Sequence, residues 1–234
     1  MQISGITKTT LVDYPGKVAC TVFTLGCNLQ CRFCHNAEFV LPNKVAQKKQ
    51  DLIEVDSLFW FLDQRKGLLD GVVLCWWEPT LYSDILEVAG KIKEKWFSVK
   101  LDTNGTNPDI LKLLIENGLI DYVAMDIKDK QESLEYLLQV NNFDFEKYNQ
   151  SMALLLQNKI DYEFRTTLIK WYHTLQDIKK ISDEISWAKR YCLKTYRVGS
   201  NLDPNFCWAS FTEEELQEFV QSVKDKFKNC YYVR

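Results

Sequence analysis

The sequence alternates between short runs rich in β-branched and aromatic residues and longer amphipathic runs. Strands separated by helices pair in parallel through right-handed crossovers, so this order constrains the fold strongly. The composition and pattern of six runs predict strands at residues 18–25, 72–75, 98–101, 122–125, 162–166 and 192–197. The prediction is an α/β fold, a partial (β/α)6 TIM-like barrel with parallel strands in a single domain, 1–234. A doubly wound sheet is the alternative.

The amphipathic runs predict helices, and residues at their ends support the assignment. The predicted helices are 56–64, 83–95, 108–117, 145–158, 176–189 and 213–227. Asn107 before Pro108 predicts a helix N-cap, Gly118 a helix end, and Thr212 with Glu215 a capping box.

Composition excludes some function classes. The 234 residues are 46% hydrophobic, enough for one large core, and the net charge is −3. Such a balance gives no field that attracts nucleic acid or an anionic membrane, so neither partner is expected. The longest apolar run, 72–77, is too short to cross a bilayer, and the first residues do not resemble a signal peptide. We therefore expect a cytoplasmic protein.

Three of the eight cysteines, Cys27, Cys31 and Cys34, lie in one predicted loop, 26–36. Cytoplasmic thiols stay reduced, so the cluster favours metal binding over disulfides. Three thiolates at this spacing suit a [4Fe–4S] cluster and leave one iron open for a ligand. Structural zinc with His35 as fourth ligand is the alternative, although Cys34 and His35 are adjacent and fit one tetrahedral ion poorly. The scattered cysteines are expected to be packing residues: Cys20, Cys75, Cys192, Cys207 and Cys230.

Polar residues follow five successive predicted strands. Because chemistry in such barrels gathers where strands end, these residues are expected to share one mouth. Ordinary polar loop residues are the alternative interpretation. After the cysteine loop, the residues are Glu78, Asp102, Thr103, Asn104, Asp126, Lys128, Arg165 and Thr167.

The cysteine spacing, Phe33 before the third cysteine and the strand–helix order resemble the radical S-adenosylmethionine superfamily. Within it, the chain resembles activating enzymes of anaerobic ribonucleoside-triphosphate reductase. The resemblance covers nearly the whole chain through residues 10–16 (TLVDYPG), 27–36 (CNLQCRFCHN), 100–108 (KLDTNGTNP), 121–128 (DYVAMDIK) and 162–167 (YEFRTT). Residues 1–17 form an N-terminal extension of the domain.

The resemblance implies a cluster held by Cys27, Cys31 and Cys34, with S-adenosylmethionine on the fourth iron and Phe33 near its adenine. Reductive cleavage of the cofactor would give a 5′-deoxyadenosyl radical, which removes a hydrogen atom from a backbone glycine of a partner reductase. The electron would come from a donor such as flavodoxin or ferredoxin.

The resemblance also implies further site residues. Asp102, Thr103 and Asp126 match positions that, in related activases, line a monovalent cation site beside the cofactor carboxylate. Such a cation would offset the repulsion among the carboxylates, which is consistent with the resemblance. Asn104, Lys128 and Arg165 are expected to contact the ribose or carboxylate of the cofactor, and salt bridges that stabilise the barrel are the alternative. The predicted cofactor-binding residues are Phe33, Trp76, Trp77, Glu78, Asp102, Asn104, Lys128 and Arg165.

One segment departs from the family pattern. The family has Gly-Gly-Glu-Pro where this chain has Trp76 and Trp77 before Glu78. Glycine serves where backbone approaches a ligand, and two indoles would block that approach. Trp96, Trp171 and Trp187 also stand where the resemblance suggests glycine. Our hypothesis is that the gene comes from an organism that reads UGA as glycine, and that it was translated as if UGA meant tryptophan. The alternative is a divergent homologue with genuine tryptophans.

Two other functions stay open at this point. One is a different small radical enzyme, either another glycyl-radical activase or a 7-carboxy-7-deazaguanine synthase-like ring contractase. The other is a non-catalytic zinc module.

Anaerobic reconstitution with iron and sulfide distinguishes the enzymes from the module. We expect a brown protein that forms 5′-deoxyadenosine from S-adenosylmethionine when a reductant is added, because three thiolates leave one iron open. Absorption spectra, metal analysis and chromatography of the nucleoside check this. A colourless protein that holds zinc would establish the module instead.

Overall fold

The structure is a computed structural model that describes residues 1–48, 51–199, 201–206 and 209–233. The chain divides into two compact units, and each is described by itself. Unit 1 comprises Met1–Asn28 and Glu38–Ala124, and unit 2 comprises Leu29–Ala37 and Met125–Arg234. The domain assignment 1–234 stays a prediction.

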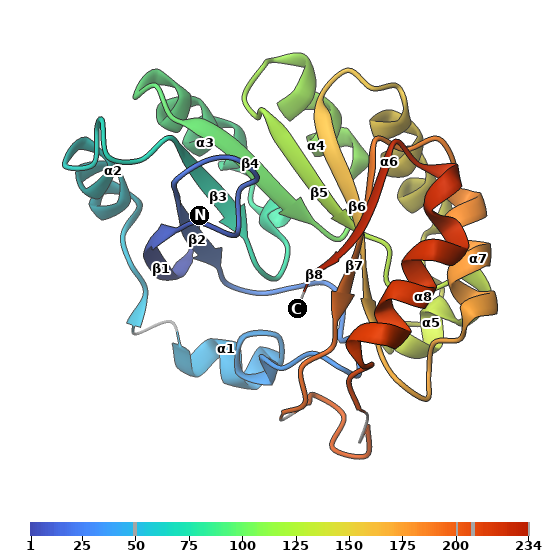
Figure 1. Ribbon diagram of the computed structural model, residues 1–234. Helices are drawn as coiled ribbons and strands as arrows, with labels where there is room; N and C mark the ends of the chain where they lie inside the picture. The colour runs from blue at the N-terminus through green and yellow to red at the C-terminus, as the bar shows by residue number, and fades with distance from the viewer. Residues whose placement is uncertain (49–50, 200, 207–208, 234) are drawn as a thin grey trace. The chain divides into compact units, whose positions relative to one another are not determined.

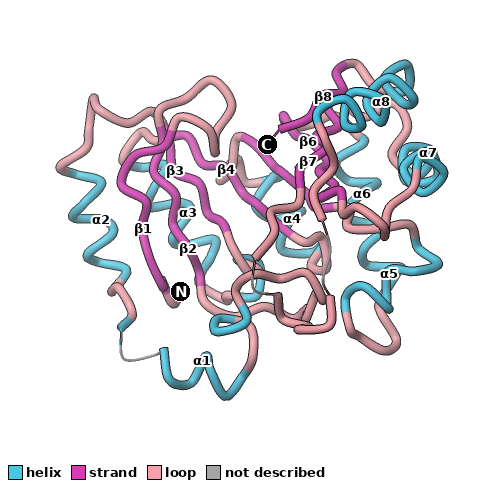
Figure 2. The backbone as a smooth tube through the Cα atoms, turned by 60° about the horizontal axis from the view of Figure 1, so that its bottom comes forward, coloured by secondary structure: helices cyan, strands magenta, loops and turns pink. Residues whose placement is uncertain are grey.

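Unit 1 is built on a sheet in which β1 (Ile3–Thr10), β2 (Ala19–Thr24), β3 (Gly71–Cys75) and β4 (Ser98–Thr103) lie in that order. Strand β1 is antiparallel to β2, and the pairs β2–β3 and β3–β4 are parallel. Figure 2 shows these four strands side by side. The α-helices of this part of the chain are α1 (Pro42–Lys48), α2 (Val55–Asp63), α3 (Ile85–Glu94) and α4 (Pro108–Glu116), with 3-10 turns η1 (Ala37–Phe39) and η3 (Pro79–Leu81).

Strand β5 (Tyr122–Asp126) carries the chain from unit 1 into unit 2. In unit 2, β6 (Asp161–Leu168), β7 (Arg190–Thr195) and β8 (Asn229–Val233) pair in parallel in that order. Figure 1 shows α7 (Leu175–Glu184) and α8 (Glu213–Val223) beside these strands. The helices of unit 2 are α5 (Gln131–Leu138), α6 (Phe145–Leu156), α7 (Leu175–Glu184), α8 (Glu213–Val223) and the 3-10 turn η4 (Lys224–Lys226).

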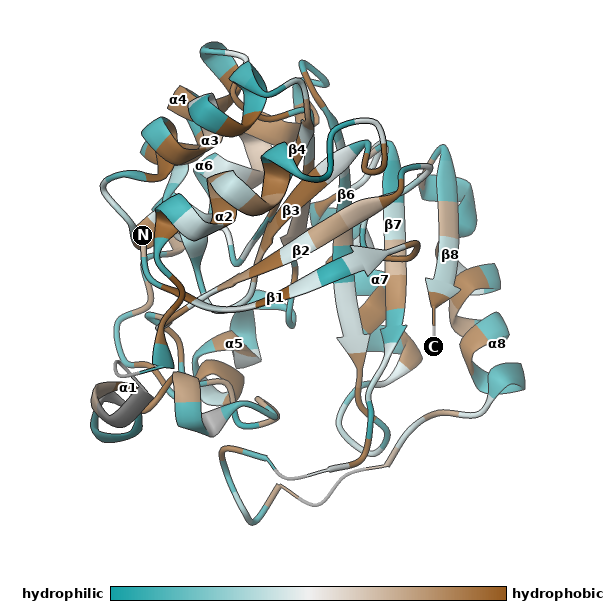
Figure 3. Cartoon of the chain, turned by 90° about the vertical axis from the view of Figure 1, so that its left-hand side faces the viewer, coloured by the Kyte–Doolittle hydropathy of each residue, from teal (hydrophilic) through white to brown (hydrophobic). Residues whose placement is uncertain are grey.

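The core follows from strand and helix periodicity. Strand β3 is buried along Gly71–Leu74, as parallel strands covered on both faces are, and Figure 3 shows it as apolar where β1 is largely polar. Helix α3 buries Ile85, Val88, Ala89 and Ile92, which recur at helical spacing and cover one face. In the described part of the chain, every helix is too short or too polar to span a bilayer.

All six predicted strands are present, but the sequence analysis missed β1 and β8. Strand β1 exposes or half-exposes its residues from Ser4 to Thr9, so no apolar alternation reveals it. Helices α1 and α5 were also missed, although Leu134, Leu137 and Leu138 of α5 are buried at helical spacing. Helix α7 ends at Glu184, five residues earlier than predicted.

All three predicted helix ends are present, although one of them lacks a side-chain cap. Gly118 follows α4 with φ +64°, and Thr212 and Glu215 form the predicted capping box. Asn107 stands at the N-cap of α4 with Pro108 after it, but its side chain does not cap the helix. Its amide Nδ2 instead donates to the Thr80 carbonyl at 2.8 Å, a tertiary partner that sequence does not reveal.

Replacing Thr212 by alanine tests the capping box. Thr212 Oγ1 accepts from the Glu215 N–H, and Glu215 Oε2 accepts from the Thr212 N–H at 2.7 Å. We expect Thr212→Ala to lower stability by about 1 kcal/mol and Tm by roughly 2–4 °C. Thermal unfolding checks this, with Thr212→Ser as the control that keeps the hydroxyl; equal loss in both variants would contradict the capping role.

Candidate active site

Glu78, three residues beyond the end of β3, has a fully buried side chain. Its Oε1 accepts from the Thr80 N–H at 3.1 Å, the Thr80 hydroxyl at 2.5 Å and the Thr103 hydroxyl at 2.8 Å. Its Oε2 accepts from the Asn104 N–H at 2.6 Å. Burial raises the pKa of Glu78, and these hydrogen bonds oppose that rise. One carboxyl group therefore ties the loop after β3 to the end of β4.

Asn104, held by Glu78, reaches a predicted cluster ligand. Its amide Nδ2 lies 3.7 Å from the Cys27 sulfur and 2.9 Å from Asn28 Oδ1. Asn104 Oδ1 accepts from the Thr106 hydroxyl at 2.7 Å, and that hydroxyl accepts from Asn28 Nδ2 at 2.9 Å. The structure thus joins the first cysteine to one predicted cofactor residue within unit 1.

Asp102 is paired inside unit 1 with a buried lysine. Its Oδ1 contacts the ammonium of Lys100, which is 1% exposed, and Cys75 Sγ lies 3.3 Å from its other oxygen. The hydroxyl of Thr103, its neighbour, donates to Glu78 and accepts from the Gly105 N–H at 3.1 Å. Protein groups therefore already compensate the Asp102 charge.

In unit 2, Asp126 lies between two cations at the end of β5. Lys128 Nζ is 3.1 Å from Asp126 Oδ2, and Arg165 Nε is 3.0 Å from Oδ1. Burial favours the neutral acid, but the charges of Lys128, Arg165 and Lys194 outweigh it and hold the Asp126 pKa well below its ordinary value. Asp126 is therefore a carboxylate at neutral pH.

The second part of the cysteine loop lies in unit 2. The Arg32 N–H donates to Leu137 O at 2.9 Å, and the Leu202 N–H donates to Cys34 O at 2.8 Å. Lys128 Nζ stands 5.8 Å from the centre of the Phe33 ring. Backbone hydrogen bonds to two distant segments thus fix the loop, and Lys128 connects Phe33 with Asp126.

The loop's thiols have the donor chemistry for a cluster. Burial raises the pKa of Cys31 to about 11 and also raises that of Cys34, while the Lys128 charge opposes both rises. The seven described cysteines are thiols rather than disulfides. Within the described ranges, no group of three His, Cys, Asp or Glu side chains is arranged to hold a metal ion. The cluster ligands stay a prediction, which the three thiols on one loop fit.

Trp76 and Trp77, two predicted cofactor residues, follow β3 with φ angles of +66° and +49°. The Trp76 ring packs against Phe23 at 4.2 Å between ring centres, and the Trp77 ring against Phe39 at 4.5 Å. The Thr24 hydroxyl donates to the Trp76 carbonyl at 2.7 Å. The indoles therefore lie in the segment that leads directly to Glu78.

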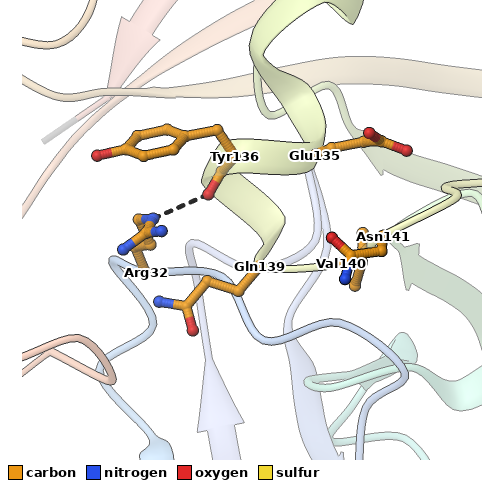
Figure 4. Close-up of a pocket in the computed structure, with 6 residues that line it drawn as sticks. All are labelled: Arg32, Glu135, Tyr136, Gln139, Val140 and Asn141. Atoms are coloured by element: carbon orange, nitrogen blue, oxygen red, sulfur yellow. Dashed lines mark hydrogen bonds between the residues drawn. The ribbon is translucent and has the colours of Figure 1, made fainter.

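A shallow pocket of about 520 Å³ lies in unit 2 beside the cysteine loop. Arg32 enters it, with Nε donating to Tyr136 O at 2.9 Å and its guanidinium 4.2 Å from the Tyr136 ring centre (Figure 4). None of the predicted cofactor residues lines this pocket. Its lining residues are Arg32, Glu135, Tyr136, Gln139, Val140 and Asn141.

Sequence reasoning missed two polar residues of unit 1, Lys100 beside Asp102 and Asn28 beside Asn104. A signal for Lys100 was present, because a lysine between Val99 and Leu101 interrupts an apolar strand and points to the same face as Asp102, two residues on. No spacing rule connects Asn28 with Asn104, since only the tertiary fold joins them.

The fold and these side chains define a class of protein: the chain belongs to the radical SAM superfamily, whose family model matches residues 21–185. Enzymes of this family use a [4Fe–4S] cluster and S-adenosylmethionine, so the two predicted cofactors are confirmed at the level of the family.

Two relatives from Methanocaldococcus jannaschii bear the name "putative glycyl-radical enzyme activating enzyme". One is 31% identical over 233 residues, covering 97% of this chain and 93% of the relative. The other is 26% identical over 190 residues, covering 78% of this chain and 69% of the relative. The predicted resemblance to glycyl-radical enzyme activases is thereby confirmed.

Solved structures confirm the predicted fold class. A domain of pyruvate-formate lyase-activating enzyme from Bacteroides vulgatus matches with TM-score 0.55 and 16% identity over 69% of this chain and 98% of its own. Streptococcus suis SuiB bound to S-adenosylmethionine matches with TM-score 0.69 and 14% identity, and Escherichia coli coproporphyrinogen III oxidase, a radical SAM enzyme, with 0.64 and 13%. Both matches cover 88% of this chain. The matched part amounts to 48% of SuiB and 52% of the oxidase.

Removing the Glu78 carboxyl group tests its structural role. Glu78→Ala leaves four hydrogen bonds without their acceptor, and we expect a loss of about 3–5 kcal/mol in the free energy of unfolding. Denaturant titration checks this. Glu116→Ala, at an exposed position on α4, should change stability by less than about 0.5 kcal/mol. Equal effects of the two substitutions would show that the Glu78 hydrogen bonds contribute nothing.

Proposed function

We propose that this protein is a radical SAM activase that generates a glycyl radical on an anaerobic ribonucleotide reductase. The observation that carries the proposal is the 31% identity with an activase-named relative over nearly the full length of both chains. The choice of reductase rests on the segments quoted above, such as residues 100–108 and 121–128. The seven described cysteines form no disulfide, which favours a reducing, cytoplasmic setting.

In this proposal, Cys27, Cys31 and Cys34 would hold the [4Fe–4S] cluster. When bound, cluster and cofactor would supply one-electron cleavage of a carbon–sulfur bond and transfer of one hydrogen atom from the partner's glycine, with methionine and 5′-deoxyadenosine as products. The residues of this chain position the groups: Asn104 contacts Cys27, and Lys128 lies near Phe33, proposed to face the adenine.

The charged residues are proposed to bind the cofactor's amino acid end. Arg165 suits a carboxylate because its planar guanidinium donates two parallel hydrogen bonds. A monovalent cation at Asp102, Thr103 and Asp126 remains part of the proposal, although Lys100 compensates Asp102 and Lys128 with Arg165 compensates Asp126. The electron is proposed to come from a flavodoxin or ferredoxin.

Electron paramagnetic resonance of the partner reductase tests the proposal. The anaerobically reconstituted protein, incubated with reductant, S-adenosylmethionine and the reductase encoded in the same genome, should produce a glycyl-radical signal. Cys31→Ser should abolish the signal and the cluster absorbance together, because serine is a poor cluster ligand.

Cys230→Ser is the matched control, since it replaces a half-buried thiol of β8 outside the loop, and it should leave both readings unchanged. Cofactor cleavage without a radical on the reductase would indicate another substrate, such as a different glycyl-radical enzyme or a deazaguanine precursor. A protein without iron would exclude every radical-enzyme function.

A further inference from the structure

Five tryptophans share a backbone conformation that tryptophan rarely adopts. Eight non-glycine residues in the described part of the chain have positive φ: two asparagines and one glutamine besides the tryptophans. Five of the six tryptophans in that part belong to this group. They are Trp76 (+66°), Trp77 (+49°), Trp96 (+71°), Trp171 (+71°) and Trp187 (+70°).

This conformation suits glycine and strains a bulky residue. At positive φ the Cβ of an L-residue approaches backbone oxygen atoms, so bulky side chains are genuine outliers there. Asparagine tolerates the region because its short polar side chain bonds locally, whereas an indole has no such compensation. The chain's own glycines occupy the same conformation at Gly16, Gly26, Gly67, Gly105 and Gly118.

Two helix ends provide a direct comparison. Helix α4 ends at Glu116, and Gly118, two residues on with φ +64°, donates its N–H to Ile115 O at 3.1 Å. Helix α3 ends at Glu94, and Trp96, two residues on, donates its N–H to Lys93 O at 2.8 Å. Trp96 therefore occupies the helix-terminating position for which glycine is preferred.

In unit 2, Trp171 in a turn and Trp187 in a loop also have the positive φ that favours glycine. The Tyr172 N–H donates to Ile169 O at 3.2 Å, which makes Trp171 the third residue of a turn with φ +71°. A type II turn requires positive φ at that position and therefore glycine or asparagine. Trp187 follows α7 and donates its N–H to Lys226 O at 2.9 Å, so its backbone is fixed from outside the helix.

Packing does not explain these residues. Trp96, Trp171 and Trp187 are 93%, 73% and 81% exposed. An indole in solvent gains little of the burial that normally makes tryptophan favourable. The strain at these three positions therefore has no offsetting core contact.

We infer that the native protein carries glycine at positions 76, 77, 96, 171 and 187, and that its gene is read with UGA as a glycine codon. The chain has 9 glycines in 234 residues, where average usage gives about 16, and five more reduce the shortage. Trp60, inside helix α2, is a genuine tryptophan in this account.

The gene and the native protein provide the first test. All five codons should be UGA and the Trp60 codon UGG, and mass spectrometry of peptides from the host should show glycine at the five positions and tryptophan at 60. Tryptophan in the host's peptides at any of the five positions would overturn the assignment there.

Variants test the inference on stability, without any cofactor. The triple substitution Trp96→Gly, Trp171→Gly and Trp187→Gly should raise Tm by roughly 5–10 °C, because it relieves strain at three exposed positions. The corresponding triple alanine variant removes the same indoles but keeps a Cβ, so it should show little of the gain. Trp60→Gly should lower Tm, because glycine weakens a helix interior. Equal gains with glycine and alanine would overturn the backbone argument.

The pair at 76 and 77 has a further consequence, which rests on the proposed function. The double variant Trp76→Gly and Trp77→Gly should bind S-adenosylmethionine at least tenfold more tightly than the tryptophan chain after anaerobic reconstitution, measured by equilibrium dialysis. If the codons and the Tm shifts agree with glycine while cofactor binding stays absent, the assignment of glycine stands and the proposed activity fails.

Discussion

The arrangement of unit 1 around its candidate site depends on one buried carboxyl group. Glu78 accepts hydrogen bonds from Thr80, Thr103 and Asn104, and so fixes the segments that follow two neighbouring parallel strands. A buried acceptor is costly to leave without donors, and buried donors are equally costly to leave without an acceptor, so each end of this network requires the other. The position of Asn104 beside Cys27 is a consequence, because its backbone N–H is held by Glu78 while its side chain points to the sulfur.

Charge compensation is the second organising feature. Asp102 in unit 1 is paired with Lys100, and Asp126 in unit 2 lies between Lys128 and Arg165. Burying a carboxylate without such a partner would be strongly unfavourable. Each carboxylate therefore has its compensating cation within its own unit.

The five left-handed positions show how backbone conformation identifies a residue independently of its side chain. At Trp96 and Trp187 the hydrogen bonds of a helix end or of a neighbouring segment set the φ angle. These bonds form between backbone atoms, which every residue has, so the conformation persists whichever side chain is attached. The sequence analysis reached the same positions from family resemblance alone, and the φ angles are an independent observation.

Sequence alone determined the features that depend on local periodicity: six strands, the capping box at Thr212 and the glycine end of α4. It also identified the cysteine loop, because ligand spacing is a property of the chain.

Only the tertiary structure decided the partners of polar side chains. Asn107 bonds to Thr80 instead of capping its helix, Asn28 meets Asn104, and Lys100 is buried against Asp102. Strand β1, with few buried residues, is recognisable only by its pairing with β2. The physical reason is the same in each case: hydrogen bonds and ion pairs between distant segments depend on how the strands are brought together, which no local pattern encodes.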